Sequence, residues 1–234
     1  MSFKDITPTD FHAHILPNAD HGSYSLETTL YQLSEAKAHG VERIIATPHF
    51  YPNSHTVEAF IKRRNASYSK LCPYLTEDMP SIKLGAEVLI CDGLDNLTEL
   101  PELFIQGTNT LLLELPFSDF SNEYCDCVYT LTQRGVNVVI AHAERYPTSN
   151  IEKLISNGAK LQLNAHAFMR VFKNRHIYDW IFRGHVVALG SDIHGFDKRA
   201  YADFVKAFSK LGMLAEQIIN ESDRIWNEAK YFSE

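Results

Sequence analysis

Several features that mark common protein classes are missing from this chain of 234 residues. No apolar run approaches the length of about 18 residues that crosses a membrane, and the first residues lack the apolar core of a signal peptide. We therefore expect a soluble cytoplasmic protein without membrane insertion. Basic residues number 22 against 29 acidic ones, and no basic run occurs. Because nucleic acids are bound through positive charge, this balance argues against a nucleic-acid partner.

Cysteine is also scarce, and its spacing fits neither a disulfide framework nor a zinc ribbon. Reduced thiols are expected. None of the cysteines is followed six positions on by arginine, so the C-x5-R loop of cysteine-dependent phosphatases is absent. A phosphocysteine intermediate is therefore not expected. The residues concerned are Cys72, Cys91, Cys125 and Cys127.

Glycine-rich phosphate loops are missing too: no G-x-G-x-x-G follows the first expected strand, and no G-x-x-x-x-G-K-[ST] occurs. The chain instead alternates short apolar runs with amphipathic runs. Strands are expected at residues 5–14, 43–49, 82–89, 110–116, 136–142, 160–165 and 185–191. Helices are expected at residues 25–39, 55–71, 121–134, 149–157, 174–183, 201–211 and 213–230.

This alternation fits either a β/α barrel or an open doubly wound sheet. Near-continuous apolar strands are typical of parallel sheets that are covered on both faces. The missing nucleotide loops, together with polar residues at the C-terminal ends of most strands, favour the barrel. No linker or repeat divides the chain. We predict one α/β domain over residues 1–234, built as a distorted seven-stranded TIM-like (β/α)7 barrel.

Histidine is the abundant residue, with 11 copies. His12 and His14 lie two apart on the first strand, so they share a face and can converge on a metal ion. An isolated H-x-H pair is weak evidence, since it also fits a solvated strand. Further candidates recur at later strand ends. The full set is His12, His14, Asp20 or His21, His49, Glu87, Glu114, His142, Asp192 and His194.

Mixed imidazole and carboxylate ligands suit manganese, iron or zinc better than magnesium or calcium. Because the candidates are too many for one ion, we predict two or three divalent ions that share a bridging carboxylate. A single histidine near a strand end is more often structural than a ligand. Glu114 differs, because a buried carboxylate inside Leu113-Glu114-Leu115 costs several kcal/mol unless a metal or an arginine is near.

Some polar residues remain open or are set aside. Asp10 could orient a ligand histidine or make a hydrogen bond at the strand end. His166 could contact the rim or support a ligand. The histidines in expected helices or before a strand are given structural roles: His39, His55, His176 and His185.

The motifs together resemble the PHP (polymerase and histidinol phosphatase) superfamily, and within it the bacterial tyrosine-protein phosphatases of capsule and exopolysaccharide loci. The resemblance covers nearly the whole chain. Its motifs stand at strand ends in the family's order. They are residues 12–17 (H-A-H-I-L-P), 46–49 (A-T-P-H), 85–87 (G-A-E), 113–116 (L-E-L-P), 141–146 (A-H-A-E-R-Y) and 191–194 (S-D-I-H).

The resemblance implies ligand groups for three ions. One ion would be held by His12, His14, Glu87 and Asp192, and a second by Glu87, Glu114 and His142. A third would be held by His49, His194 and the Asp20-His21 turn. The family turn reads G-x-D-D-G, whereas His21 replaces the second aspartate here. We favour His21 as the ligand; alternatively, Asp20 turns inward and His21 faces substrate.

The resemblance also implies Arg145 and Arg199 as phosphate-binding arginines, with His194 as a third catalytic residue. A planar guanidinium can bind two phosphate oxygens at once. A metal ion lowers the pKa of water to about 7, so hydroxide can attack phosphorus. The predicted activity is metal-dependent phosphotyrosine-protein phosphatase, with manganese favoured and a tyrosine kinase of polysaccharide synthesis as partner.

Other readings compete with this prediction. A small-molecule phosphatase, such as a histidinol-phosphate phosphatase, is the main alternative. An exonuclease is disfavoured by the net charge, and a catalytically silent metal-binding module that docks a kinase is disfavoured by the retained arginines. Tyr24, Phe50 and Tyr51 are expected on loops near the site, where they either stack on a phosphotyrosyl ring or pack at the rim.

Overall fold

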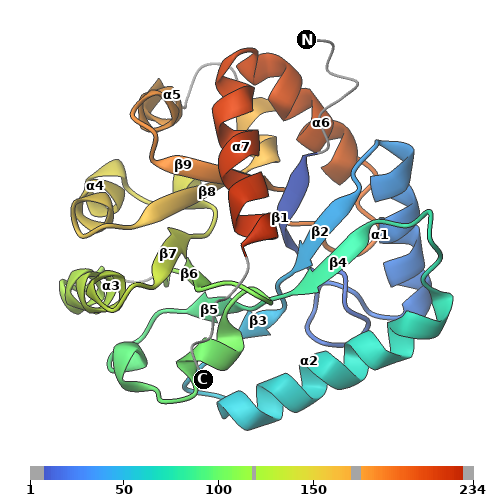
Figure 1. Ribbon diagram of the computed structural model, residues 1–234, viewed down its shortest axis with the longest axis horizontal. Helices are drawn as coiled ribbons and strands as arrows, with labels where there is room; N and C mark the ends of the chain where they lie inside the picture. The colour runs from blue at the N-terminus through green and yellow to red at the C-terminus, as the bar shows by residue number, and fades with distance from the viewer. Residues whose placement is uncertain (1–7, 118–119, 170–174, 229–234) are drawn as a thin grey trace.

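The computed structural model describes residues 8–117, 120–169 and 175–228. Its strands lie at the centre and its helices around them (Figure 1). Every strand pair that forms a ladder is parallel. The strands are β1 (Thr9–Ala13), β2 (Arg43–Ala46), β3 (His49–Phe50), β4 (Ser81–Leu84), β5 (Glu87–Leu89), β6 (Thr110–Glu114), β7 (Asn137–Ile140), β8 (Lys160–Asn164) and β9 (Val186–Gly190).

The α-helices follow the expected order. They are α1 (Leu26–Ala38), α2 (Val57–Leu71), α3 (Glu123–Gln133), α4 (Thr148–Ser156), α5 (Arg175–Phe182), α6 (Ala200–Leu211) and α7 (Leu214–Asn227). Ser25 caps α1 as predicted, because its hydroxyl accepts the Thr28 N–H at 3.1 Å. Parts of three predicted elements, at residues 5–7, 174 and 229–230, lie outside the described residues.

Two of the predicted strands are each divided in two. The run 43–49 becomes β2 and β3, and the run 82–89 becomes β4 and β5. Pro48 lies in the first break, where its missing N–H cannot contribute to a ladder. The register is the same on both sides, since Ala46 pairs with Leu84 and His49 pairs with Glu87. The break therefore leaves the strand register unchanged.

The hydrogen-bonded strands form two sheets, with the orders β1-β2-β4 and β3-β5-β6-β7-β8-β9. The α/β class with parallel strands is confirmed, whereas a closed seven-stranded barrel stays a prediction. The residues that follow β9 lie beside β1 all the same. The Asp192 N–H donates to the His12 carbonyl at 2.8 Å, and the His14 N–H donates to the Ile193 carbonyl at 3.3 Å.

Apolar side chains pack on both faces of the strands. The larger cluster packs strand residues such as Ile44 and Leu113 against the surrounding helices. A smaller cluster joins residues of β1, β2, β6, β7 and β9 with Ile225 of α7. Leu112 belongs to this smaller cluster, and Glu114, two residues on, shares its face. One face of β6 therefore changes from apolar to charged toward its C-terminal end.

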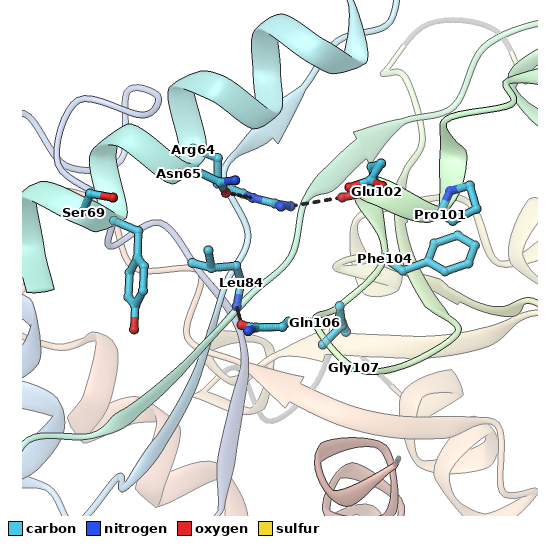
Figure 2. A pocket seen from close by; sticks show the side chains of 11 residues that line it. Arg64, Asn65, Ser69, Leu84, Pro101, Glu102, Phe104, Gln106 and Gly107 are labelled. Carbon is cyan, nitrogen blue, oxygen red and sulfur yellow. Dashed lines mark hydrogen bonds between the residues drawn. The ribbon is translucent and has the colours of Figure 1, made fainter. Parts of the chain in front are cut away.

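Arg64 of α2 makes hydrogen bonds beside the second strand break, and Figure 2 shows the one to Glu102. Its Nη1 group donates to the Gly85 carbonyl at 3.0 Å and to the Glu102 carbonyl at 3.3 Å. Burial lowers the pKa of Arg64 to about 10. The side chain borders a cavity of about 350 Å³ between α2 and residues 101–107. Arg64 thus ties α2 to the segment that leads into Glu87.

All four cysteines are free thiols, as predicted. Cys72 is exposed and Cys127 is buried. Within the three described ranges, no helix is both long enough and apolar enough to span a membrane.

Candidate metal centre

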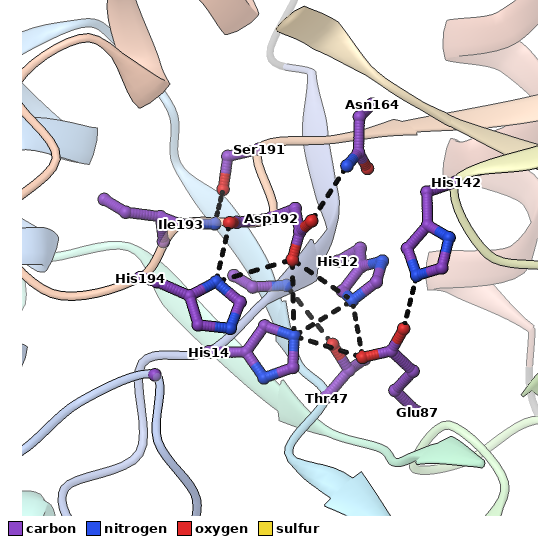
Figure 3. A network of polar contacts seen from close by, with 12 residues as sticks. His12, His14, Thr47, Glu87, His142, Asn164, Ser191, Asp192, Ile193 and His194 are labelled. Atoms are coloured by element: carbon purple, nitrogen blue, oxygen red, sulfur yellow. Dashed lines mark hydrogen bonds and ion pairs between the residues drawn. The ribbon is translucent and has the colours of Figure 1, made fainter. Parts of the chain in front are cut away.

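The side chains predicted as metal ligands come together at one edge of the strands. Figure 3 shows six of them, namely His12, His14, Glu87, His142, Asp192 and His194. A pocket of about 370 Å³ opens there. His12 and His14 lie behind it and are fully buried. The pocket is lined by His21, His49, Tyr51, Glu87, Glu114, Phe117, His142, Arg145, Asp192 and His194.

Glu87, at the start of β5, is the centre of the cluster. Its Oε2 lies 2.9 Å from His49 Nδ1, 3.1 Å from His12 Nε2 and 3.2 Å from His14 Nε2. Its Oε1 lies 2.8 Å from His142 Nε2. The residue is only 1% exposed. One buried carboxylate thus faces four imidazoles, which is the position that a bridging ligand would take.

Glu114, at the end of β6, lies on the other side of two of these histidines. Its Oε1 is 3.6 Å from His142 Nε2, and its Oε2 is 3.7 Å from His49 Nδ1. The partner that a buried carboxylate in an apolar run requires is therefore a pair of imidazoles. Asp192 faces the first pair, with Oδ1 at 3.8 Å from His12 Nε2 and 3.5 Å from His14 Nε2.

A hydrogen-bond chain fixes the orientation of His12. Asn164 donates from Nδ2 to the Asp192 carboxylate at 2.8 Å, so its Oδ1 is the acceptor for Gln162 Nε2 at 3.0 Å. Gln162 Oε1 therefore lies 3.1 Å from His12 Nδ1 and accepts the His142 N–H at 2.8 Å. Because an amide oxygen only accepts, His12 carries its proton on Nδ1. Its Nε2 lone pair points toward His14.

At the Asp20-His21 turn, Asp20 is the residue that turns inward, as in the alternative to the favoured prediction. Asp20 turns inward, with Oδ2 2.7 Å from His14 Nδ1 and accepting the His49 N–H at 3.0 Å. The ring of His21 lies in the pocket, stacked on His49 with centroids 4.8 Å apart and tilted by 33° against His194 with centroids 4.9 Å apart. Asp20 therefore orients His14, while His21 is the residue of the turn that faces the site.

Tyr146 orients His142 from behind. Its hydroxyl donates to the Leu115 carbonyl at 3.0 Å and accepts the Leu115 N–H at 3.2 Å. The single hydroxyl proton is thereby used, so His142 Nδ1, at 3.1 Å, must donate to the hydroxyl. The Nε2 atom of His142 then faces Glu87, whose Oε1 lies 2.8 Å away. This is the usual arrangement in which a second group fixes the tautomer of a ligand histidine.

The backbone is strained at two of the candidate ligands. Within the described ranges, three non-glycine residues have positive φ: Asn18 at 58°, His142 at 33° and Asp192 at 51°. Left-handed backbone is unfavourable for such residues and is concentrated at functional sites. His142 and Asp192 each stand two residues after the last residue of β7 and of β9. The strain turns their side chains inward at the points where those strands end.

Two glycines allow the strand ends to approach closely. A Cβ on Gly190 would lie 2.5 Å from His12 Cβ and 2.7 Å from Gln162 Nε2. A Cβ on Gly22 would lie 2.0 Å from His14 Cβ. Any side chain at either position would displace a candidate ligand or the residue that orients it.

The charges of the cluster are strongly coupled. Burial opposes the charge on Glu87, yet the surrounding histidines, His12 first, hold its pKa well below its usual value. Burial likewise opposes protonation of His142, but Glu114 and Glu87 raise its pKa to about 9. Burial and the neighbouring His14 lower the pKa of His194 to about 4. His194 is thus a neutral imidazole at pH 7, the form that binds metals.

The donor atoms fit bound divalent metal ions. The Nε2 atoms of His12 and His14 lie 3.0 Å apart, and both ring Nδ1 atoms already face acceptors. His49 Nδ1 and Glu87 Oε2 are buried without an aligned hydrogen bond in the described part of the chain. Three compact donor groups result, namely His12-His14-Glu87, His49-Glu87-Glu114 and His14-His49-His194. A cation between such atoms would compensate all of them.

The two predicted arginines are placed differently. Arg145 lines the pocket, and its Nη2 group pairs with Asp192 Oδ2. Arg199 is exposed at the start of α6, where its N–H donates to Asp197 Oδ1 at 2.9 Å. It does not line the pocket. The structure thus brings Arg145, but not Arg199, to the cluster.

The predicted aromatic contacts are only partly correct. Phe50 is 1% exposed and packs on Phe60 at 5.2 Å between ring centroids, so of its two alternatives, stacking on substrate or packing, it packs. The reason is strand alternation, because His49 faces the site and the next residue faces away. Tyr51 lines the pocket, whereas Tyr24 is 65% exposed outside it.

The open polar residues are also resolved. Asp10 accepts the Ser191 N–H at 2.8 Å and the Ser191 hydroxyl at 2.6 Å, so it joins β1 to the end of β9. His166 is exposed and lies 3.0 Å from Asp203 on α6, away from the cluster. Sequence reasoning missed Gln162, Asn164, Tyr146 and Phe117. A polar residue inside Leu161-Gln162-Leu163 was the signal that could have found the first of them.

The sequence is similar to that of known proteins. The sequence model of the family "Capsular polysaccharide synthesis, CpsB/CapC" matches residues 8–211. Tyrosine-protein phosphatase YwqE of Bacillus subtilis is 28% identical over 170 residues, which cover 70% of this chain and 66% of that protein. Tyrosine-protein phosphatase CpsB of Streptococcus pneumoniae is 24% identical over 205 residues, which cover 81% of this chain and 84% of that protein.

A solved structure agrees in fold. It comes from crystal structures of YwqE from Bacillus subtilis and CpsB from Streptococcus pneumoniae, described as unique metal-dependent tyrosine phosphatases. It superposes with a TM-score of 0.78 at 20% identity and covers 96% of both chains. The family match spans every candidate ligand from His12 to His194. This chain therefore belongs to the capsular polysaccharide synthesis family CpsB/CapC.

Proposed function

We propose that the chain is a metal-dependent phosphotyrosine-protein phosphatase. The observation that carries the proposal is the convergence of six histidines and three carboxylates on one pocket that also holds Arg145. The relatives reported above are named tyrosine-protein phosphatases, and the related solved structures are described as metal-dependent. Residues and relatives point to the same chemistry.

The proposed ligands are the nine side chains expected from the sequence: His12, His14, His21, His49, Glu87, Glu114, His142, Asp192 and His194. Two or three divalent ions fit the three donor groups, and manganese, iron and zinc all accept mixed imidazole and carboxylate ligands. We favour manganese. When bound, such ions lower the pKa of water and neutralise charge on a phosphoryl group.

The chain's own residues do the rest of the work. Gln162 and Tyr146 hold the Nε2 atoms of His12 and His142 toward the site, so the ligand geometry is set before substrate enters. Asp192 holds the guanidinium of Arg145 at the pocket wall. From there Arg145 can bind two equatorial phosphoryl oxygens and stabilise the charge that they carry in the transition state. Arg199 stays a predicted phosphate-binding residue, and His194 a predicted catalytic one.

We propose phosphotyrosine as the substrate because a phenolate, with a pKa of about 10, leaves more readily than an alkoxide. The partner that fits the family is a tyrosine kinase of polysaccharide synthesis, acting in the cytoplasm. The competing function is hydrolysis of a small phosphate monoester. The pocket of about 370 Å³ is open at the protein surface, which suits a side chain presented on a protein.

The deciding experiment compares two substrates. Purified protein loaded with manganese should hydrolyse a phosphotyrosyl peptide with a higher kcat/KM than histidinol phosphate. The reverse order would establish the small-molecule function instead. Hydrolysis that survives complete metal removal would overturn the metal-dependent mechanism, and no hydrolysis of either substrate at any metal loading would overturn the phosphatase proposal.

A further inference from the structure

Two aromatic residues stand on the wall of a pocket that is otherwise made of charged or metal-binding side chains. Tyr51 follows β3 and Phe117 follows β6. Strand β5, which begins at Glu87, lies between β3 and β6 in the sheet. The two rings therefore leave the sheet from either side of the strand that supplies the central carboxylate.

The two rings differ in how firmly they are held. Tyr51 stacks on the candidate ligand His49, with centroids 5.3 Å apart and planes inclined by 17°. Burial, and then Glu114, raises the pKa of its hydroxyl to about 12, so the ring stays neutral. Phe117 is 77% exposed, and its ring centroid lies 6.2 Å from that of Tyr146. Most of the Phe117 ring therefore remains available to a ligand.

Exposure of a single phenylalanine is common and by itself shows nothing. The position of Phe117 is what matters, because the same pocket contains Glu87 and Arg145. When the phosphoryl group of a substrate lies beside these residues, its ester substituent must extend toward the pocket mouth. A phenyl substituent would meet an aromatic wall there, and aromatic pairs are favourable at centroid distances of 4.5–7 Å.

On the basis of the proposed function, we propose that Phe117 is a substrate-binding residue that packs against the phenyl ring of phosphotyrosine. Through this contact it sets a preference for aryl over alkyl phosphate esters. Tyr51 is the fixed part of the same wall. An alkyl or sugar phosphate can be bound by Arg145 and at the proposed metal centre equally well, but gains nothing from Phe117.

The test measures how strongly two competitive inhibitors, phenylphosphonate and methylphosphonate, inhibit hydrolysis of a phosphotyrosyl peptide. Both carry the anion, but only phenylphosphonate carries the aromatic ring. For Phe117→Ala, the Ki of phenylphosphonate should rise about tenfold, the upper range for an aromatic pair. The Ki of methylphosphonate should change less than twofold. The KM for the peptide should rise with kcat nearly unchanged, and Phe117→Tyr should restore the preference.

A matched control is Phe182→Ala on α5, where the side chain is 81% exposed and outside the pocket. It should leave both Ki values unchanged. Equal weakening of both phosphonates by Phe117→Ala, or no change in either, would overturn the inference while the phosphatase function stands. A wild-type protein that hydrolyses no phosphotyrosyl peptide would overturn the proposed function and the inference with it.

Discussion

The Nε2 atoms of His12 and His14 face each other at 3.0 Å, although both rings hold their Nδ1 proton against a buried acceptor. Gln162 is the acceptor for one ring and Asp20 for the other. Two lone pairs cannot approach so closely unless a proton or a metal ion lies between them. Without metal the proton is supplied by His14, since burial opposes its charge but Asp20 and Glu87 raise its pKa.

Metal removal should therefore destabilise the fold as well as stop catalysis. Apo protein keeps its carboxylates and imidazoles buried with protons alone to balance them, whereas bound ions stabilise the native state by mass action. At a free metal concentration of 100 times Kd the gain is about 2.7 kcal/mol per site. Differential scanning fluorimetry with and without chelator should show a lower Tm for the metal-free protein.

Re-addition provides the control for this measurement. Manganese, zinc and ferrous iron, each added to the same metal-free sample, should restore the Tm in proportion to the metal bound, as measured by elemental analysis. An identical Tm in metal-free and reloaded protein would contradict the metal assignment of the cluster.

The candidate ligands could be found from sequence because parallel strands present their C-terminal ends at one place. His12 and Asp192 are far apart in the chain, yet β1 and the end of β9 are joined by backbone hydrogen bonds. The ends of the predicted strands were enough to gather Glu87, Glu114 and His142 with them, although in the structure Glu87 begins the short strand β5. The sheet break at Pro48 was not predicted, although Thr47 and Pro48 interrupt the apolar run after Ala46.

The residues that orient the ligands could not be assigned in the same way. Gln162 reads as one polar position in a strand, and its role depends on β8 lying between β7 and β9. Tyr146 acts through a hydroxyl whose partners are backbone atoms of Leu115, which no side-chain motif reveals. The role of Phe117 could be assigned only once the pocket was seen in the structure. Phe50, in contrast, could have been excluded by strand alternation.

Gln162→Leu should weaken metal binding without removing a ligand. The change takes away the acceptor for His12 Nδ1 and for the His142 N–H, so both ligands lose their fixed orientation. Loss of such a supporting contact typically costs 10–100-fold in metal affinity. Calorimetric titration of the metal-free protein with metal should show this loss of affinity. The control variant Gln133→Leu, at an exposed position on α3, should bind metal as the wild type does. Wild-type affinity in Gln162→Leu would refute the orienting role.

Tyr146→Phe should act on both stability and the metal site. The hydroxyl satisfies the buried N–H and carbonyl of Leu115, and leaving such groups unpaired costs about 1–3 kcal/mol. The free energy of unfolding in urea should fall by that amount with an unchanged m-value. The affinity of the ion held by His142 should fall as well, whereas exposed Tyr129→Phe on α3 should change neither quantity.

Thiol alkylation should leave the activity intact. Burial raises the pKa of Cys127 to about 12, so that thiol is unreactive in the native state, while exposed Cys72 is the cysteine open to reagent. Iodoacetamide treatment followed by mass spectrometry should modify Cys72 before Cys127, with the phosphatase rate unchanged. Parallel loss of activity and labelling of any one cysteine would point to a thiol mechanism instead.

Arg145→Ala is expected to lower kcat/KM about 10²-fold, the usual cost of one transition-state donor, with metal content retained. Arg145→Lys keeps the charge but loses the planar fork, so it should recover only part of the rate. Arg199→Ala serves as the comparison, because its side chain is exposed and outside the pocket. We expect it to cost less than Arg145→Ala. An equal loss would mean that Arg199 reaches the bound phosphoryl group after all, as the sequence resemblance implies, and that substrate binding moves it there.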